Sequence, residues 1–230
     1  GARTVSVAAL LNLETLKARD NLTPNALLSV ATDVLVRTSW LPVVFQRFAP
    51  TSLEQRFRTG PFGRGWSHTF DIALHRVSPD AVEIRGPGSA RRGFSQLWKG
   101  PWMGGPGDAG VLTEAGDGGY ELREKDGSTL SFSNGGSLVS IVDANGNGIN
   151  LTYQDDKLSR VDFSKGVALV LGYNADGRVS SVSDSLGGRI DYTYDGSSEH
   201  LVAVASAGLT TEYAYEAAVG GAADHALSEV

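Results

Sequence analysis

The 230-residue sequence contains no cysteine, which excludes disulfide bonds, thiolate nucleophiles and cysteine-based zinc sites. It also lacks an apolar run of the roughly twenty residues that a membrane-spanning helix needs, so no membrane span is predicted. Basic residues are not in excess, and a formal net charge of -6 argues against a protein that binds nucleic acid. No secretory signal is recognisable in the first residues, and we expect the chain to be an excerpt of a longer protein.

Proline, tryptophan and tyrosine are distributed unevenly along the chain. All eight prolines and all four tryptophans lie at or before Pro106, whereas all seven tyrosines lie at or after Tyr120. This change predicts three regions: a partly helical connector (1–34), a β-rich capping module (35–119) and a repeat array that is incomplete at its C-terminal end (120–230). The helical prediction rests on apolar residues spaced three apart within the stretch from Ser6 to Asp20.

A repeat of about 21 residues is visible in the last region. Its aromatic anchors follow one another at steps of 21, 20, 21 and 21 residues: Phe132, Tyr153, Tyr173, Tyr194 and Tyr215. Between them a second apolar pair recurs: Leu138 with Ile141, Leu158 with Val161, Val179 with Val182, and Leu201 with Val204. Turns rich in Asn, Asp and Gly separate the two series. The pattern predicts an all-β fold of stacked antiparallel hairpins that form a curved sheet.

Two stretches resemble the YD repeat of Rhs proteins, in which Tyr, Asp, Gly and then Arg-Leu or Arg-Val recur. They are YNADGRVSSVSD (173–184) and YTYDGSSEHLVAV (192–204). Upstream, LPVVFQRFAPTSLEQRFRTGPFGRGWSHTFDIAL (41–74), above all its GPFGRGW core, is similar to the module that precedes the first repeats in that family. The resemblance covers roughly residues 35 to 230. Gln154 and Glu216 depart from the Asp that usually follows Tyr, and the unit at Leu201 lacks the Arg.

The resemblance implies a large β-sheet shell, as in bacterial Rhs toxins, insecticidal toxin-complex cocoons and animal teneurins. Toxin members of the family enclose a C-terminal effector, which an Asp-based autoproteolytic segment releases; neither is recognisable in this sequence. We therefore expect a non-enzymatic segment of a secreted or cell-surface protein, whose partners are the rest of the parent chain and, in the toxin case, the effector. The alternative is an extracellular adhesion or filament protein that binds a surface glycan or another protein.

One stretch of the array has the spacing of a cation-binding loop. Asp143, Asn145 and Asn147 place oxygen-bearing side chains at alternate positions, as at the start of many calcium loops. The bidentate Glu that should follow is missing, and every other unit has an inter-repeat turn at this place. Calcium is therefore the single cofactor hypothesis, and a turn built from Asn and Gly is its alternative.

The tryptophans allow two readings. Trp66, Trp98 and Trp102 could form an aromatic platform for a sugar, or they could cap the array by burying the open face of its first hairpin. The second reading is favoured because Trp is usually well buried and the edge of a sheet needs protection.

No catalytic set is predicted. The four histidines are far apart in the sequence, and we expect His68 and His75 to be the one pair that could approach in space, on opposite faces of a strand. No nucleophile, base and orienting group can be assembled from the pattern. The last strand near Tyr213 and Tyr215 is expected to leave an unpaired edge, which would fray or support end-to-end self-association.

Overall fold

The structure is a computed structural model that describes residues 27–36, 43–50, 53–164, 166–216, 220 and 224–230. The described part is nearly all β, which confirms the predicted fold class. Two short helical turns interrupt it, α2 (Leu53–Arg56) and the 3₁₀ turn η1 (Pro87–Ser89). Among the described residues, no helix has the length and hydrophobicity needed to cross a lipid bilayer.

The described residues of the N-terminal half form three small sheets. One has the order β1-β2-β5, one pairs β3 with β4, and one has the order β6-β7-β8-β9. Their bounds are β1 (Leu27–Val36), β2 (Val43–Pro50), β3 (Thr59–Gly60), β4 (Gly63–Arg64), β5 (Ser67–His68), β6 (Ala73–Ser78), β7 (Ala81–Arg85), β8 (Arg91–Ser95) and β9 (Met103–Gly104). We call the described residues between 27 and 104 the covering segment.

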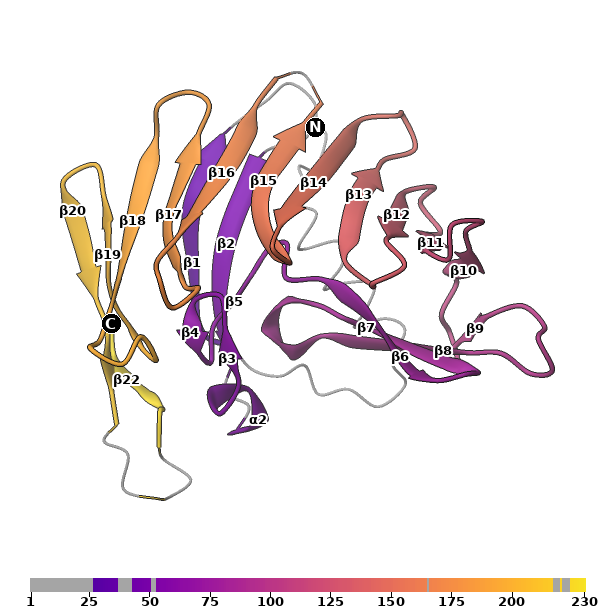
Figure 1. Ribbon diagram of the computed structural model, residues 1–230, viewed down its shortest axis with the longest axis horizontal. Coiled ribbons are helices and arrows are strands. Elements are labelled where there is room, and N and C mark those ends of the chain that lie inside the picture. The colour runs from indigo at the N-terminus through magenta and orange to yellow at the C-terminus, as the bar shows by residue number, and fades with distance from the viewer. Residues whose placement is uncertain (1–26, 37–42, 51–52, 165, 217–219, 221–223) are drawn as a thin grey trace.

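The C-terminal half is an 11-stranded antiparallel sheet in which each strand pairs with the next along the chain. Figure 1 shows this sheet as a fan from β10 to β20. Its strands are β10 (Val111–Glu114), β11 (Tyr120–Arg123), β12 (Thr129–Phe132), β13 (Leu138–Val142), β14 (Gly148–Gln154), β15 (Lys157–Phe163), β16 (Ala168–Tyr173), β17 (Val179–Asp184), β18 (Arg189–Tyr194), β19 (Leu201–Ser206) and β20 (Leu209–Glu212). We call residues 111–212 the repeat array. A separate hairpin of β21 (Ala214–Tyr215) and β22 (Leu227–Glu229) follows.

A β-bulge in each unit explains the spacing of the second apolar series. Leu158 and Val161 are three residues apart, which in a regular strand would place them on opposite faces. Tyr153 pairs with Leu158 while its neighbour Thr152 pairs with Arg160, so one residue is skipped and both apolar side chains are buried on one face. The same shift occurs at the aromatic anchor of three further units: Phe132, Tyr173 and Tyr194.

The aromatic anchors also connect each unit to the unit before it. The hydroxyl of Tyr173 donates a hydrogen bond to the carbonyl oxygen of Leu158 at 2.8 Å. The equivalent bonds run from Tyr153 to Leu138 at 2.9 Å, from Tyr194 to Val179 at 2.7 Å and from Tyr215 to Leu201 at 3.0 Å. The four acceptors are the first residues of the second apolar series, so these hydrogen bonds join the two series. We call the four bonds together the tyrosine ladder.

The covering segment buries the apolar face of the repeat array. Aromatic rings from the two parts meet along much of the sheet, and Figure 1 draws β1 and β2 across its central strands. The ring pairs are Trp102 with Tyr120, Phe70 with Phe163, Phe62 with Tyr192 and Trp66 with Tyr213. One continuous core therefore joins both halves of the chain.

Two of the predicted region boundaries, at residues 34 and 120, differ from the limits of the strands in the structure. The limit at residue 34 falls inside β1, which is a strand and not part of a helical connector. The predicted helix between Ser6 and Asp20 lies outside the described residues. The 11-stranded sheet begins at β10 and not at residue 120, because β10 pairs with β11 although it carries no aromatic anchor of its own.

The predicted free edge near Tyr213 and Tyr215 is partly wrong. β21, which contains Tyr215, pairs with β22, and the amide of Tyr213 donates to the carbonyl oxygen of Val202 at 3.0 Å. Within the described residues, the open edge at this end of the 11-stranded sheet is β20, which pairs with β19 alone. Self-association at that edge remains a prediction.

Candidate functional site

A turn from the GPFGRGW stretch fastens the covering segment to the repeat array. The amide of Arg64 donates to the carbonyl oxygen of Glu199 at 2.7 Å, and the amide of Val179 donates to that of Pro61 at 2.8 Å. Between these contacts, Gly63 has a φ of +83°, and a Cβ there would lie 2.5 Å from the Glu199 carbonyl oxygen. Glycine is therefore required by the backbone conformation and by the close approach.

A buried charged cluster forms a second connection. Arg47 is 1% exposed and makes two hydrogen bonds to Asp33, at 2.6 and 3.0 Å. Its guanidinium also donates to the hydroxyl of Tyr213 at 3.2 Å and lies 5.0 to 5.5 Å from the ring centres of Trp66, Tyr192 and Tyr213. Burial alone would lower the pKa of Arg47, but the hydrogen bond and charge of Asp33 outweigh it and raise the pKa. The cluster is a fixed cation inside an aromatic cage.

A cavity of about 350 Å³ lies between the covering segment and the array. Asp71 lines this cavity, and its side chain is exposed to water within it. The protein atoms that surround the carboxyl exclude part of its solvation and raise its pKa to about 6, while the charge of Arg58 lowers it. Burial, followed by the charge of Asp71, raises the pKa of Tyr153 and of Tyr173 to about 12. The other polar side chains in the lining are Thr59, His68, Ser137, Asp156, Lys157 and Arg178.

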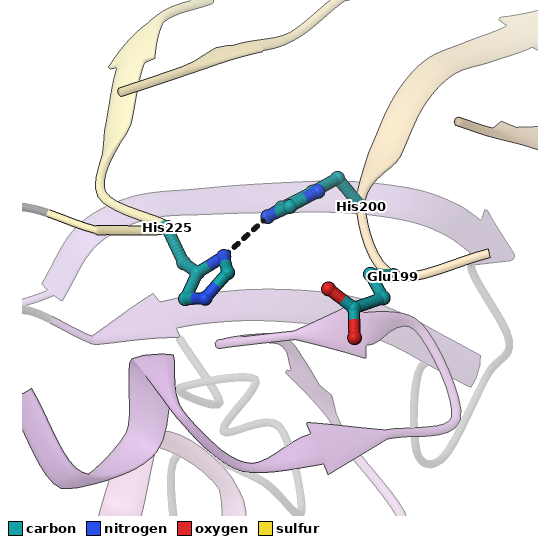
Figure 2. Close-up of side chains that lie close together, drawn as sticks. All are labelled: Glu199, His200 and His225. Carbon is teal, nitrogen blue, oxygen red and sulfur yellow. Dashed lines mark hydrogen bonds between the residues drawn. The ribbon is translucent and has the colours of Figure 1, made fainter. Parts of the chain in front are cut away.

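Two histidines meet beside the turn between β18 and β19. His200 Nε2 lies 2.9 Å from His225 Nδ1, and the two rings are stacked with their centres 5.0 Å apart. Figure 2 shows the carboxylate of Glu199 near the same pair. One ligand atom from each of the three residues lies within 4.8 Å of the others, so they are a candidate metal centre. On the outer side, Asp195 Oδ2 lies 2.7 Å from His200 Nδ1, and Arg64 donates to Glu199 Oε1 at 2.7 Å.

Hydrogen bonds to Asp195 and Glu199, and the burial of His225, favour ionised carboxylates and a neutral His225 imidazole. Burial would raise the pKa of Asp195, but the hydrogen bonds that it accepts, first that of His200, lower the pKa to about 2. The hydrogen bond from Arg64 lowers the pKa of Glu199. Burial, with the positive charge of Arg64, lowers the pKa of His225. Neutral imidazole nitrogens and carboxylates are the protonation states that bind metal ions.

The predicted calcium loop is a closed turn. Asp143 Oδ1 accepts the amides of Asn145 at 2.8 Å and Asn147 at 2.9 Å, and Oδ2 accepts the side-chain amide of Asn147 at 2.8 Å. Asp184 and Asn174 accept the amides two and four residues later in the same way. The arrangement in the structure is therefore that of a repeated Asx turn, and it favours the turn reading over calcium.

The three tryptophans do not form one platform. Trp66 and Trp102 are buried, whereas Trp98 is 98% exposed. Trp102 packs on Tyr120 near the first hairpin, as the capping interpretation predicts. Trp66 instead donates to the hydroxyl of Tyr215 at 2.8 Å, so it covers the last units and not the first. The reason is that the covering segment lies along the apolar face of the array and does not plug its end alone.

The expectation about the histidines was wrong. His200 and His225 form the close pair, whereas His68 is buried and His75 is exposed. Nδ1 of His68 accepts the amide of Phe70 at 3.2 Å, and burial lowers the pKa of this imidazole to about 3. The turn that carries His200 could have signalled the pair, because Glu-His replaces the small and polar residues of the other turns.

The sequence pattern also did not predict two buried clusters of arginine and carboxylate side chains. Besides the Arg47–Asp33 pair, buried Arg92 binds Asp108 through two hydrogen bonds, at 2.5 and 2.7 Å, and also binds Glu124. No local pattern marks these residues, because each partner comes from a different element.

Comparison with known proteins gives a match over part of the chain. Residues 25–94 match a domain of unknown function, DUF6531. No curated protein matches the sequence. Among solved structures, the chain is similar to the N-terminal domain of effector protein SpvB from Salmonella typhimurium strain LT2, with 12% sequence identity and a TM-score of 0.49; the alignment covers 82% of this chain and 100% of that chain.

Proposed function

We propose that this chain is a structural, non-enzymatic segment of a large exported protein of the Rhs/YD-repeat type, and that it forms the start of a β-sheet shell. The tyrosine ladder carries this proposal, because each hydroxyl donates to a backbone carbonyl of the preceding unit. A connection that recurs at every step allows units to be added at β20 without a new kind of contact. The secreted or cell-surface location follows from the same family resemblance.

The covering segment supports the view that this is where the shell begins. A sheet that is apolar on one face needs a cover, and here residues from the preceding part of the chain provide it. Later units of a long array would lack such a cover and would enclose a space. In the toxin members of the family, that space holds the effector.

The cavity around Asp71 is the strongest argument for an enzyme, since a carboxyl with a pKa near 6 is common at catalytic sites. Catalysis needs partner groups that are free to react. The hydroxyls of Tyr153 and Tyr173 instead donate to backbone carbonyls, and His68 Nδ1 accepts an amide. We therefore assign the cavity to the packing of the covering segment on the array.

Peptide mass spectrometry of the native polypeptide beyond Val230 tests the proposal. The expected result is a series of further units with the 20- to 21-residue anchor spacing of this sequence. In the native protein, the amides of β20 should also exchange slowly with solvent, because the next strand would pair with them. A native chain without further units, or one in which β20 exchanges as an open edge, contradicts the proposal.

A surface adhesion role is the second candidate, and exposed apolar side chains favour it. Trp98 is 98% and Leu97 72% exposed in the loop between β8 and β9, and Met103, the first residue of β9, is 58% exposed. An exposed indole stacks on sugar rings or on a protein partner. Glycan-array and cell-binding measurements should then show binding that Trp98→Ala removes and Val77→Ala, which changes another exposed apolar residue, leaves intact.

A further inference from the structure

We propose that Glu199, His200 and His225 bind one divalent transition-metal ion of the zinc class, which fastens the β21–β22 hairpin to the repeat array. This inference is independent of the proposed shell function, because it rests on side chains that the repeat does not share. The three residues come from two places in the chain: the turn between β18 and β19, and the residues just before β22. Their ligand atoms already lie within 4.8 Å of one another.

The orientation of His200 supports the site. Its Nδ1 lies 2.7 Å from Asp195 Oδ2, so the ionised carboxylate holds the ring proton on Nδ1. The lone pair is then on Nε2, the atom that faces His225 at 2.9 Å. A carboxylate that holds the outer nitrogen of a histidine is the usual support for a metal-ligating imidazole.

Without a metal, one proton can join the two imidazoles, with His225 Nδ1–H donating to His200 Nε2. A tetrahedral zinc ion with bonds of about 2.0–2.1 Å to nitrogen would hold two ligand nitrogens roughly 3.3 Å apart. The observed 2.9 Å therefore needs to widen by a few tenths of an ångström. Small side-chain rotations achieve such a change. The ion would take the place of the shared proton, which would move to Nε2 of His225, so that this imidazole stays neutral.

Glu199 completes a three-ligand set. Arg64 donates a hydrogen bond to Oε1 of its carboxylate at 2.7 Å, and the second oxygen, Oε2, is the one we assign to the metal. The negative charges of Glu199 and Asp195 offset the guanidinium of Arg64 and the charge of the ion. Three protein ligands leave a fourth position for water.

The donor set selects the class of metal. Two imidazoles and one carboxylate suit Zn²⁺, Co²⁺, Ni²⁺ and Cu²⁺, whereas Ca²⁺ and Mg²⁺ prefer oxygen ligands alone. The site therefore differs in chemistry from the calcium hypothesis for Asp143 and its neighbours. A titration with both kinds of ion distinguishes the two.

The test is a calorimetric titration of the EDTA-treated protein with ZnCl₂, and with MgCl₂ and CaCl₂ for comparison. The expected result is one Zn²⁺ per chain, with no saturable binding of the other two ions at the same concentrations. His200→Gln and His225→Gln should each weaken zinc binding at least tenfold. His75→Gln is the matched control, since His75 is an exposed histidine outside the cluster, and its affinity should equal that of the wild type.

A conservative variant tests the supporting carboxylate. Asp195→Asn keeps an oxygen that can accept the amides of Glu199 and His200, but it cannot accept the Nδ1 proton through its amide nitrogen. We expect zinc affinity to fall about 10- to 100-fold while the circular dichroism spectrum stays that of the wild type.

Two readouts keep the inference testable if a variant fails to fold. Zn²⁺ should raise the melting temperature of the wild type, and Co²⁺ should give the visible absorption of a tetrahedral site. The absence of saturable zinc binding to the wild type would overturn the inference. So would a folded His225→Gln protein that binds zinc as tightly as the wild type.

Discussion

The repeat array and the covering segment reach stability by opposite means. In the array, each strand pairs with its sequence neighbours, and one tyrosine hydrogen bond recurs from unit to unit. In the covering segment, the stabilising contacts occur once each and cross large distances in the sequence, such as the 166 residues between Arg47 and Tyr213. The comparison teaches that the array is modular, because its contacts recur from unit to unit, whereas each contact of the covering segment depends on particular residues that the other units lack.

This difference predicts where single substitutions will be costly. The loss of one bond in the array leaves similar bonds above and below it. The loss of a central group in the cover leaves a buried partner that no neighbouring unit can satisfy. Four substitutions test this contrast, and we take them from the largest expected effect to the smallest.

The largest effect is expected for Arg47→Met. It leaves the carboxylate of Asp33 buried without its cation, which typically costs about 3–5 kcal/mol of unfolding free energy. Urea denaturation measures the change. The double variant Arg47→Met/Asp33→Asn should cost less than the sum of the two single variants, because neither buried charge remains.

The matched control for Arg47 is Arg160→Met in the array, where Arg160 and Asp162 form an exposed pair on β15. Water solvates both partners, so we expect stability to stay close to that of the wild type. Equal losses for Arg47→Met and Arg160→Met would contradict the contrast between the cover and the array.

Gly63→Ala should give the next largest effect. A positive φ costs an L-residue roughly 1–2 kcal/mol, and the new Cβ would also lie 2.5 Å from the Glu199 carbonyl oxygen, for a total of about 3 kcal/mol. Gly146, in an array turn, has a similar φ of +79°, but a Cβ added there would meet no atom within 4 Å. Gly146→Ala should therefore lower the free energy of unfolding only by the cost of the positive φ. A difference of less than about 0.5 kcal/mol between the two variants would mean that the contact with the array contributes little.

His68 makes the cover sensitive to acid. Its imidazole has a pKa of about 3 in the folded chain against 6.5 normally, so below pH 6.5 the unfolded state binds the extra proton. Above pH 6.5 the burial of neutral His68 does not lower the free energy of unfolding. Below that pH, the free energy of unfolding falls by about 1.4 kcal/mol per pH unit as the pH drops towards 3. Denaturation at pH 7, 6 and 5 should show a smaller loss for His68→Asn, whose side-chain oxygen can still accept the amide of Phe70. Parallel pH profiles for the two proteins would exclude this role.

The sequence predicted the features that repeat. The 20- to 21-residue spacing indicated the hairpins, the turn residues and the side chains that face the core, because these depend on neighbours within a unit. It did not predict that the covering segment lies along the array, since the contacts of Arg47 and Trp66 with the last units involve residues far away in the chain. The His200–His225 pair was missed for the same reason. Residues that depart from the repeat, such as Glu199 and His200 in their turn, are the signal that points to such contacts.

Apart from the control Arg160→Met, the smallest effect is expected for the tyrosine ladder. Tyr173→Phe removes one hydrogen bond to the Leu158 carbonyl oxygen and keeps the ring, so it should cost about 1 kcal/mol in urea denaturation. Tyr153→Phe should cost a similar amount, and the first unit already has Phe132 at this position, which indicates that a unit can form without the hydroxyl. If the units are modular, substitutions at Tyr153 and Tyr194, two units apart, should add within about 0.5 kcal/mol. A loss well above the sum would mean that the ladder acts as one cooperative network, and the array would then resemble its cover more than a chain of independent units.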